Sequence, residues 1–164
     1  MSVCSLENGF REFKIEGRKI RIMNESMHRT IKDYCKSIIQ NHNNLLKKNK
    51  SIKSKFWDLP ACASICHDGT YSNTTKGFSH SPKGVVWHTT LKNRIETLGD
   101  IGYPSNIGER FIIGNCAEQH SGNAYMKKYH DNHLNALHFT ETVRPRTKEI
   151  IPSCENCKYI FPNL

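Results

Sequence analysis

The sequence has no long hydrophobic run. None of its 164 residues belongs to a stretch that approaches the roughly 18 consecutive apolar residues needed by a membrane-spanning helix. The first segment, MSVCSLENGFREFK, also lacks the apolar core of a secretory signal peptide. These two absences predict a protein that does not enter membranes, and they favour an intracellular location, in the cytoplasm or the nucleus.

Acidic side chains are comparatively scarce. The chain has 15 Asp and Glu residues against 24 Lys and Arg residues, which gives a formal net charge of +9. Such an excess favours a polyanionic partner such as nucleic acid. Much of it lies in one run, residues 47–55 (KKNKSIKSK), and runs of this kind are also typical of a solvated helix end. The charge therefore agrees with nucleic-acid binding without establishing it.

No internal repeat is apparent either, so a repeat architecture is not expected. The contents of hydrophobic (37%) and charged (24%) residues are ordinary for a globular protein. The length is sufficient for one hydrophobic core and short for two. We therefore expect a single domain over residues 1–164.

The N-terminal half of the sequence predicts few regular elements. Apolar residues at three- and four-residue steps predict a helix over residues 26–48. Before it, apolar and polar residues alternate over residues 12–23, which predicts a hairpin or two short strands. Residues 60–83 are rich in Ser, Thr, Gly and His, so they are expected to form a long loop or irregular insertion. Loops of this length in a compact domain are usually functional.

The C-terminal half predicts alternating strands and helices. Strands are expected over residues 84–91, 110–113 and 134–143, and helices over residues 116–129 and 153–160. This order is typical of a βαβ-type unit, which places the N-termini of two helices side by side at the carboxyl ends of the strands. A ligand site is expected at that position.

The cysteines are odd in number, seven, so a complete disulfide framework explains them poorly, and a reducing compartment or a bound metal fits better. Cys154 and Cys157 are three residues apart, on one face of a helical turn, where both thiolates can hold one metal ion. Cys116 begins the preceding predicted helix and is the third candidate ligand. Thiolates are favoured at helix N-termini, because the helix dipole and free N–H groups lower the thiol pKa. Three thiolates leave the fourth position of a tetrahedral zinc ion to water, as in catalytic zinc sites.

Glu118 favours a catalytic over a structural zinc. Two residues after Cys116, its carboxylate can approach a water molecule at the zinc without binding the metal, and it can pass protons to a departing amino group. A glutamate two residues after the first ligand, followed later by Pro and a CxxC pair, is typical of zinc-dependent deaminases of nucleobases.

Other interpretations of these cysteines stay open. A structural zinc site would be closed by a fourth ligand, for which His120 and His138 are candidates, and a redox CxxC motif would carry no metal. The thiols could also be unrelated to one another. A second metal site is a further alternative in the segment CASICH, where Cys62 and Cys66 are followed by His67, although buried or free thiols are the commoner explanation.

The segments IIGNCAEQHSGNAYM and RPRTKEIIPSCENCKYIF resemble the cytidine deaminase-like superfamily. Within it they are most similar to the zinc-dependent deaminase domains of bacterial polymorphic toxins. The resemblance covers about residues 110–161 and implies a deaminase-like domain whose catalytic core spans about residues 84–164. It implies an α/β, three-layer fold in which a mixed β-sheet is flanked by helices and the zinc site lies at two helix N-termini.

The same resemblance implies residue roles and a reaction. Cys116, Cys154 and Cys157 would bind Zn2+, Glu118 would be the general acid and base, and the backbone N–H of Ala117 would lie beside the base. The reaction would be hydrolytic deamination of cytosine or adenine in nucleic acid, a nucleotide or a nucleoside, with ammonia as a product. A toxin of this kind would have an immunity-type inhibitor protein as its partner.

Basic residues near the CxxC motif indicate a nucleic-acid substrate. Arg144 and Arg146 precede it and are expected at the mouth of the zinc pocket, where phosphates flanking a target base would pass. Because a base must be unstacked to reach a buried zinc, single-stranded nucleic acid should be preferred. Asn106 and Glu109 loosely resemble ribose-binding residues, so a free nucleoside is an alternative. A noncatalytic zinc-stabilised nucleic-acid-binding or interaction module is another, and it would have no need of Glu118.

Overall fold

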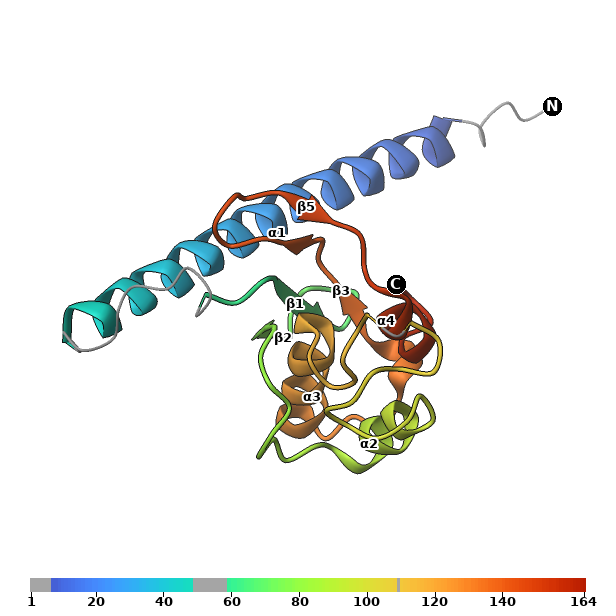
Figure 1. Cartoon of the computed structure of the whole chain (residues 1–164). Coiled ribbons are helices and arrows are strands. Elements are labelled where there is room, and N and C mark those ends of the chain that lie inside the picture. Colours follow the sequence, from blue (N-terminus) through green and yellow to red (C-terminus); the bar gives the residue numbers. More distant parts are fainter. Residues whose placement is uncertain (1–6, 49–58, 109) are drawn as a thin grey trace.

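The structure, a computed structural model, describes residues 7–48, 59–108 and 110–164, with side chains from residue 25 onward. Its helices are α1 (Glu7–Lys48), α2 (Thr89–Glu96), α3 (Ala117–Tyr129) and α4 (Glu155–Ile160), with a 3-10 turn at Leu134–Ala136. Its strands are β1 (Ala63–His67), β2 (Thr74–Phe78), β3 (His138–Phe139), β4 (Thr142–Val143) and β5 (Ile150–Ile151). In Figure 1, α1 and α3 lie on opposite sides of the sheet, so the described chain is layered as helix, sheet and helix.

All strand pairings among the described residues are antiparallel. The order is β2-β1-β4-β5, and β3 also pairs with β1. The mixed α and β composition is therefore confirmed, whereas the predicted βαβ unit and mixed sheet are wrong. Residues 110–113, predicted as the strand before α3, make only an isolated bridge, between Ile112 and Pro104. Backbone hydrogen bonds join this segment to residues 102–105, which satisfies its polar groups outside the sheet.

β1 is the central strand, and all five of its residues are buried. Ala63 and Ile65 belong to the cluster that α1 covers on one face, and Cys66 belongs to the cluster that α3 covers on the other. A strand covered on both faces has no polar alternation, so the usual signal of a half-buried strand is missing. This is one reason why the prediction of an irregular insertion over residues 60–83 is wrong.

Small and polar residues of the β1–β2 hairpin face α3. Ser64 is paired with Gly77, and the Thr75 hydroxyl donates to the carbonyl oxygen of Ser121 at 2.7 Å. The Ser, Thr and Gly residues that predict a loop therefore lie where the sheet and α3 approach closely. Composition alone cannot separate these two uses of small residues.

The helix predicted over residues 26–48 is confirmed as the C-terminal part of α1. Its buried apolar side chains recur at three- and four-residue steps and pack against β1 and β4; they are Met27, Ile31, Cys35 and Ile38. The hairpin predicted over residues 12–23 is wrong, because α1 begins at Glu7 and continues through that segment. Its charged residues and Ile are compatible with a helix, and one glycine in a helix interior costs only about 1 kcal/mol. None of the described helices is long and apolar enough to cross a membrane.

The other predicted elements have mixed outcomes. Residues 84–91, predicted as a strand, form a loop and the first turn of α2, whose buried residues Leu91 and Ile95 are four apart as a helix requires. Residues 134–143, predicted as one strand, contain the 3-10 turn and two short strands, β3 and β4. The helices predicted over residues 116–129 and 153–160 are confirmed as α3 and α4, with ends shifted by one or two residues.

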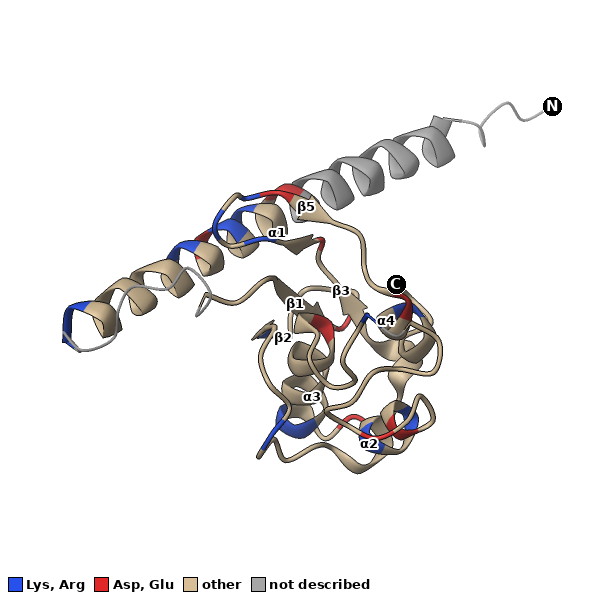
Figure 2. Cartoon of the chain, in the orientation of Figure 1, with Lys and Arg blue, Asp and Glu red and all other residues tan. Residues whose placement is uncertain are grey.

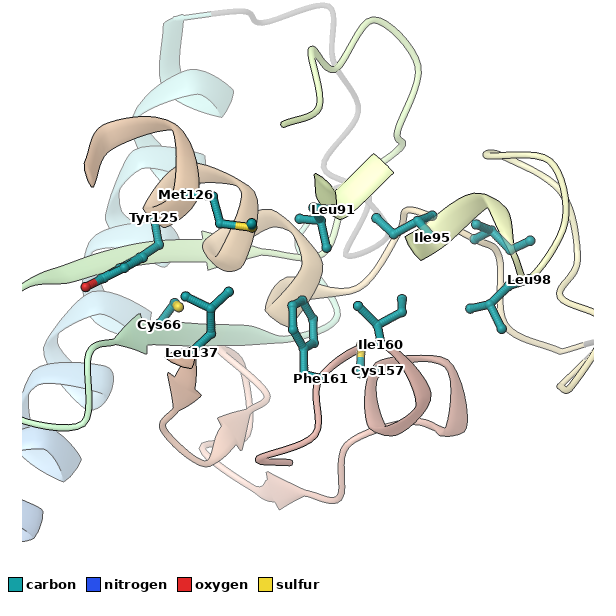
Figure 3. Packing of buried hydrophobic residues seen from close by; sticks show 11 residues of the cluster. Cys66, Leu91, Ile95, Leu98, Tyr125, Met126, Leu137, Cys157, Ile160 and Phe161 are labelled. Atoms are coloured by element: carbon teal, nitrogen blue, oxygen red, sulfur yellow. The ribbon is translucent and has the colours of Figure 1, made fainter. Parts of the chain in front are cut away.

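The core beside α3 fixes the C-terminal helix. Figure 3 shows Phe161, which follows α4, directed at α3, with Leu91 and Ile95 of α2 close to Ile160. The ring of Phe161 also packs on that of Phe139, with 4.6 Å between their centroids. The helix that carries Cys154 and Cys157 is therefore held against the helix that follows Cys116.

Gly77 sets the distance between β2 and α3. A Cβ atom at this position would lie 2.3 Å from the backbone nitrogen of Ser121 and 2.6 Å from the carbonyl oxygen of Ala117. We expect Gly77→Ala to push α3 away from the hairpin and to lower the free energy of unfolding by about 1 to 3 kcal/mol, because backbone atoms of a helix cannot yield separately. Chemical denaturation measures the change. Gly108→Ala is the matched control, since its Cβ would first meet the movable Phe111 ring, at 3.1 Å. Equal losses in the two variants would contradict this packing.

His67 makes the stability depend on pH. Its ring lies 4.2 Å from that of Tyr71, and Nδ1 accepts the N–H of Gly69 at 3.0 Å. Burial and the neighbouring His138 lower the pKa of His67 from its usual 6.5 to about 4. Between these values the unfolded state binds more protons, so the unfolding free energy should fall as the pH drops from about 6.5 toward 4.

We expect His67→Gln to make this decline shallower. The slope of the unfolding free energy against pH should decrease by the equivalent of up to one bound proton. Urea denaturation at a series of pH values measures it, and His133→Gln, which replaces an exposed histidine, should keep the wild-type slope. A His67→Gln slope equal to that of the wild type would show that His67 is not responsible.

Candidate metal and catalytic site

The first turn of α3 brings a thiol and a carboxylate together. Cys116 is the N-cap, with extended backbone angles, and Glu118 lies in the first turn, where the helix dipole favours a negative charge. Gly114, with φ +86°, turns the chain into this helix, and a Cβ atom there would lie 2.8 Å from Pro82. A side chain at residue 114 would therefore displace the start of α3.

The N-terminus of α4 supplies two further thiols. Cys154 is its N-cap and Cys157 lies in its first turn, so the two side chains share one face of the helix. The Sγ atoms of the two N-cap residues, Cys116 and Cys154, are 3.2 Å apart. The N-termini of α3 and α4 therefore lie side by side, as expected. The sheet of the protein, however, is not the mixed sheet that was predicted.

The three thiols are spaced as one metal ion requires. The Sγ atoms of Cys116, Cys154 and Cys157 all lie within 4.8 Å of one another. Zinc–sulfur bonds of about 2.3 Å at tetrahedral angles place sulfur atoms roughly 3.8 Å apart. Soft thiolate ligands are suited to zinc. The donor set therefore fits zinc, and in the described part of the chain it is the one such group of potential ligands.

The three thiols differ in their protonation. A hydrogen bond with the Cys116 thiol lowers the pKa of Cys154 to about 3, with further help from Cys157 and from N–H groups in the first turn of α4. The same hydrogen bond raises the pKa of Cys116, and burial raises the pKa of Cys157. Because Cys116 and Cys157 favour their protonated forms, metal binding at the cluster must release protons.

Glu118 lies beside the three thiols but does not belong to the group of candidate metal ligands. Its side chain is buried, and Oε2 is 3.7 Å from the Sγ atom of Cys157. The hydroxyl of Thr142, on β4, donates to Oε1 at 2.7 Å. Thr142 was not predicted from the sequence. It is 24 residues from Glu118, and only its position on the inward face of β4 identifies it as a partner. Thr142 fixes the orientation of the carboxylate.

Gln119 is a second residue that sequence reasoning missed. It is fully buried, and its Nε2 atom lies 3.7 Å from Cys157 Sγ, to which it donates. As the residue after Glu118 it carries no motif of its own. Its amide supplies positive polarity to a sulfur that is otherwise buried in the core, and hydrogen bonds of this kind orient metal ligands.

The two histidines considered as rival ligands lie elsewhere. His120 stacks on the ring of His80, with 3.6 Å between centroids, and its Nε2 is 3.1 Å from the His80 carbonyl oxygen. Burial and His80 lower the pKa of His120 to about 4, so its ring is neutral at pH 7. The ring of His138 packs on His67. Among the described residues, no histidine joins the three thiols.

The segment CASICH does not form a second metal site in the described structure. Cys66 is in the core, the ring of His67 packs against that of Tyr71, and Cys62 lines a pocket. Cys62 is close to Ala117, whose N–H lowers the pKa of the thiol, although burial acts more strongly and raises it overall. Ala117 itself is fully buried. Cys62 is therefore a neighbour of the three-thiol group, a position that its sequence context does not indicate.

A pocket of about 730 Å³ opens onto the thiols and Glu118. Its walls come from the residues before β1 and after β2, the segment before α3, the β4–β5 hairpin and the start of α4. The lining residues are Ala61, Cys62, Ser79, Arg110, Phe111, Ile112, Asn115, Cys116, Glu118, Thr142, Arg144, Glu149, Ile151, Pro152, Ser153, Cys154, Glu155 and Lys158. The carboxylate and two of the thiols are thus reachable from one hollow.

The pocket rim carries both signs of charge. Arg144 lines it as expected and pairs with Glu149 at 3.3 Å, in an exposed ion pair. Arg146 and Asn106 are not among the described lining residues, and Glu109 lies outside the residues that the structure describes. In Figure 2, segments of the ribbon coloured for acidic and for basic residues both occur around β5 and α4. The rim is therefore not a uniformly basic surface.

No family model matches the chain, and neither the curated proteins nor the solved structures contain a match.

We expect the purified protein to bind one zinc ion per chain, and Cys154→Ser to lose most of it and to unfold at a lower temperature, since ligation and folding are coupled. Elemental analysis by mass spectrometry and thermal unfolding measure both effects. Cys62→Ser is the matched control, because Cys62 lies beside the three-thiol group without belonging to it. Protein prepared without chelator that contains no zinc, with all three thiols freely alkylated, would contradict the assignment.

Proposed function

We propose that this chain is a zinc-dependent hydrolytic deaminase of cytosine or adenine, with single-stranded nucleic acid preferred over a free nucleotide or nucleoside. The observation that carries the proposal is the position of Glu118. This buried carboxylate lines the same pocket as Cys116 and Cys154 and lies 3.7 Å from Cys157. A CxxC pair alone is shared by many classes of protein, but three thiols beside a pocket-lining glutamate are not.

The residues have separate roles in this chemistry. Cys116, Cys154 and Cys157 would hold zinc, which when bound supplies Lewis acidity that activates water near neutral pH. Glu118 accepts a proton from the attacking water and returns protons to the ring nitrogen and to the departing amino group. The exocyclic C–N bond breaks, a carbonyl group forms at that ring carbon, and ammonia leaves.

Thr142 determines which carboxylate oxygen moves the proton. Because its hydroxyl donates to Oε1 of Glu118, that oxygen is already engaged. Oε2 faces Cys157 and is the oxygen directed toward the thiol group. Thr142 therefore acts through Glu118, as a residue that positions the proton carrier.

The alternative is a noncatalytic zinc-stabilised module that binds nucleic acid or another protein. A structural zinc is normally closed by a fourth protein ligand, and no other described residue joins the three thiols. A buried carboxylate beside sulfur ligands is also costly and has no use in a module that only needs a folded scaffold. Both observations favour the deaminase.

The substrate preference rests on the pocket and on charge. A volume of about 730 Å³ is within the range of small-ligand pockets, roughly 300 to 1,000 Å³, so one nucleotide can enter. Arg144 at the rim and the net charge of +9 suit a phosphate backbone. The resemblance to polymorphic toxin deaminases extends the proposal to an intracellular target and an immunity-type inhibitor protein as partner.

We expect Glu118→Gln to lower turnover at least about 100-fold while zinc content and folding stay as in the wild type, because glutamine keeps the shape but cannot carry protons. The protein is incubated with single-stranded DNA, RNA, cytidine and adenosine, and ammonia and product bases are measured. Thr142→Val should give a smaller loss. Glu155→Gln, which alters an exposed carboxylate of the same pocket, is the matched control and should be active.

Two outcomes would count against these roles. Wild-type turnover in Glu118→Gln would remove Glu118 as the acid and base. Loss of zinc from that variant would show instead that the carboxylate supports the metal. No deamination of any of the four substrates by the zinc-loaded wild type would leave the noncatalytic module as the better explanation.

A further inference from the structure

A second hollow, of about 720 Å³, adjoins the pocket of the thiols. It is formed by the loop after β2 and the segment between α2 and α3, and its lining residues are Ser81, Pro82, Lys83, Ile101, Gly102, Tyr103, Ile112 and Asn115. Ile112 and Asn115 line both hollows. These two residues therefore form the boundary between the two hollows, so the hollows are neighbours on the protein surface.

The second hollow presents an aromatic ring and a positive charge. Tyr103 is 66% exposed, and no ring of the described residues stacks on it, so one face of its ring is open to a ligand. Lys83 is exposed and forms no ion pair with a described residue, and the described lining of the hollow contains no acidic residue. An exposed ring beside a lysine is the combination with which proteins hold single-stranded nucleic acid, because the base stacks and the phosphate pairs.

The backbone that carries Tyr103 is tied to the segment leading into the thiol site. The N–H of Ile113 donates to the carbonyl oxygen of Tyr103 at 2.9 Å, and Pro104 is bridged to Ile112. Residue 113 is buried and is followed by the Gly114 turn into α3. The backbone of Tyr103 is therefore fixed relative to the segment that leads to Cys116 and Glu118, as a subsite for an adjoining unit of one substrate requires.

We infer that the second hollow binds the nucleotide next to the target base in a single-stranded nucleic acid, with Tyr103 stacking on its base and Lys83 pairing with its phosphate. The inference rests on the proposed function for the identity of the target base, and it adds a binding site for the neighbouring nucleotide. Each hollow is within the volume range of small-ligand pockets, so each can hold one nucleotide. A free nucleoside fills only the first hollow.

The test measures binding and turnover separately. Zinc-loaded wild type, Tyr103→Ala, Tyr103→Phe and Lys83→Ala are titrated by fluorescence anisotropy against a short labelled single-stranded DNA that contains one target base. Tyr103→Ala should weaken binding about tenfold, within the range found for removal of one stacking ring. Tyr103→Phe should keep near wild-type affinity, and Lys83→Ala should reduce the dependence of binding on salt. Tyr159→Ala and Lys36→Ala are the matched controls, since both remove exposed side chains outside the two hollows.

The stacking partner is identified with modified oligonucleotides. An abasic position is placed on the 5′ or the 3′ side of the target base in separate strands. One of the two should bind the wild type about tenfold more weakly, and Tyr103→Ala should cause no further loss with that strand, because both changes remove the same contact. Turnover of the free nucleoside should be unchanged in Tyr103→Ala and Lys83→Ala.

The outcomes separate this inference from the proposed function. Deamination of oligonucleotide and nucleoside alike, with no effect of Tyr103→Ala on binding, would overturn the second subsite and leave the deaminase in place. Binding that depends on Tyr103 and on one flanking base, without deamination of any base, would support the subsite and count against the deaminase. Failure of the wild type to bind the oligonucleotide at all would overturn the subsite.

Discussion

The candidate site depends on the close approach of the β1–β2 hairpin to the start of α3. The hairpin reaches the backbone of α3 because Gly77 has no side chain, and the hydroxyl of Thr75 closes the contact by donating to Ser121. This contact fixes the helix end at which Cys116 and Glu118 stand. The positions of the N-cap residue Cys116, of the Glu118 carboxylate and of the pocket edge at Ser79 all depend on this contact.

The residues of the site come from three separate elements, which are packed against one another. Glu118 comes from α3, Thr142 from β4, and Cys154 and Cys157 from the first turn of α4. α4 has only six residues, too few to be stable alone, and the burial of Ile160 and Phe161 holds it in place. Apolar packing therefore sets the geometry of the polar site.

The three thiols could be grouped from the sequence, whereas the sheet could not be predicted. Cys116, Cys154 and Cys157 could be grouped because helix caps and three-residue spacing are local rules, and the two helices that carry them were predicted correctly. β1 was missed because its five residues are buried on both faces and so show no alternation. Thr142 and the second hollow could not be found because they depend on contacts between segments distant in the sequence.

Cys116 and Cys154 are 38 residues apart, and the segment between them contains α3, β3, β4 and β5. A metal held by both would close this loop as a reversible cross-link, which reduces the conformational entropy of the unfolded chain. Ligand binding to the folded state alone also adds stability that grows with free ligand concentration. The lifetime of the protein in a cell would then follow the supply of available zinc, so that a fall in zinc would expose the chain to proteolysis as well as remove its chemistry.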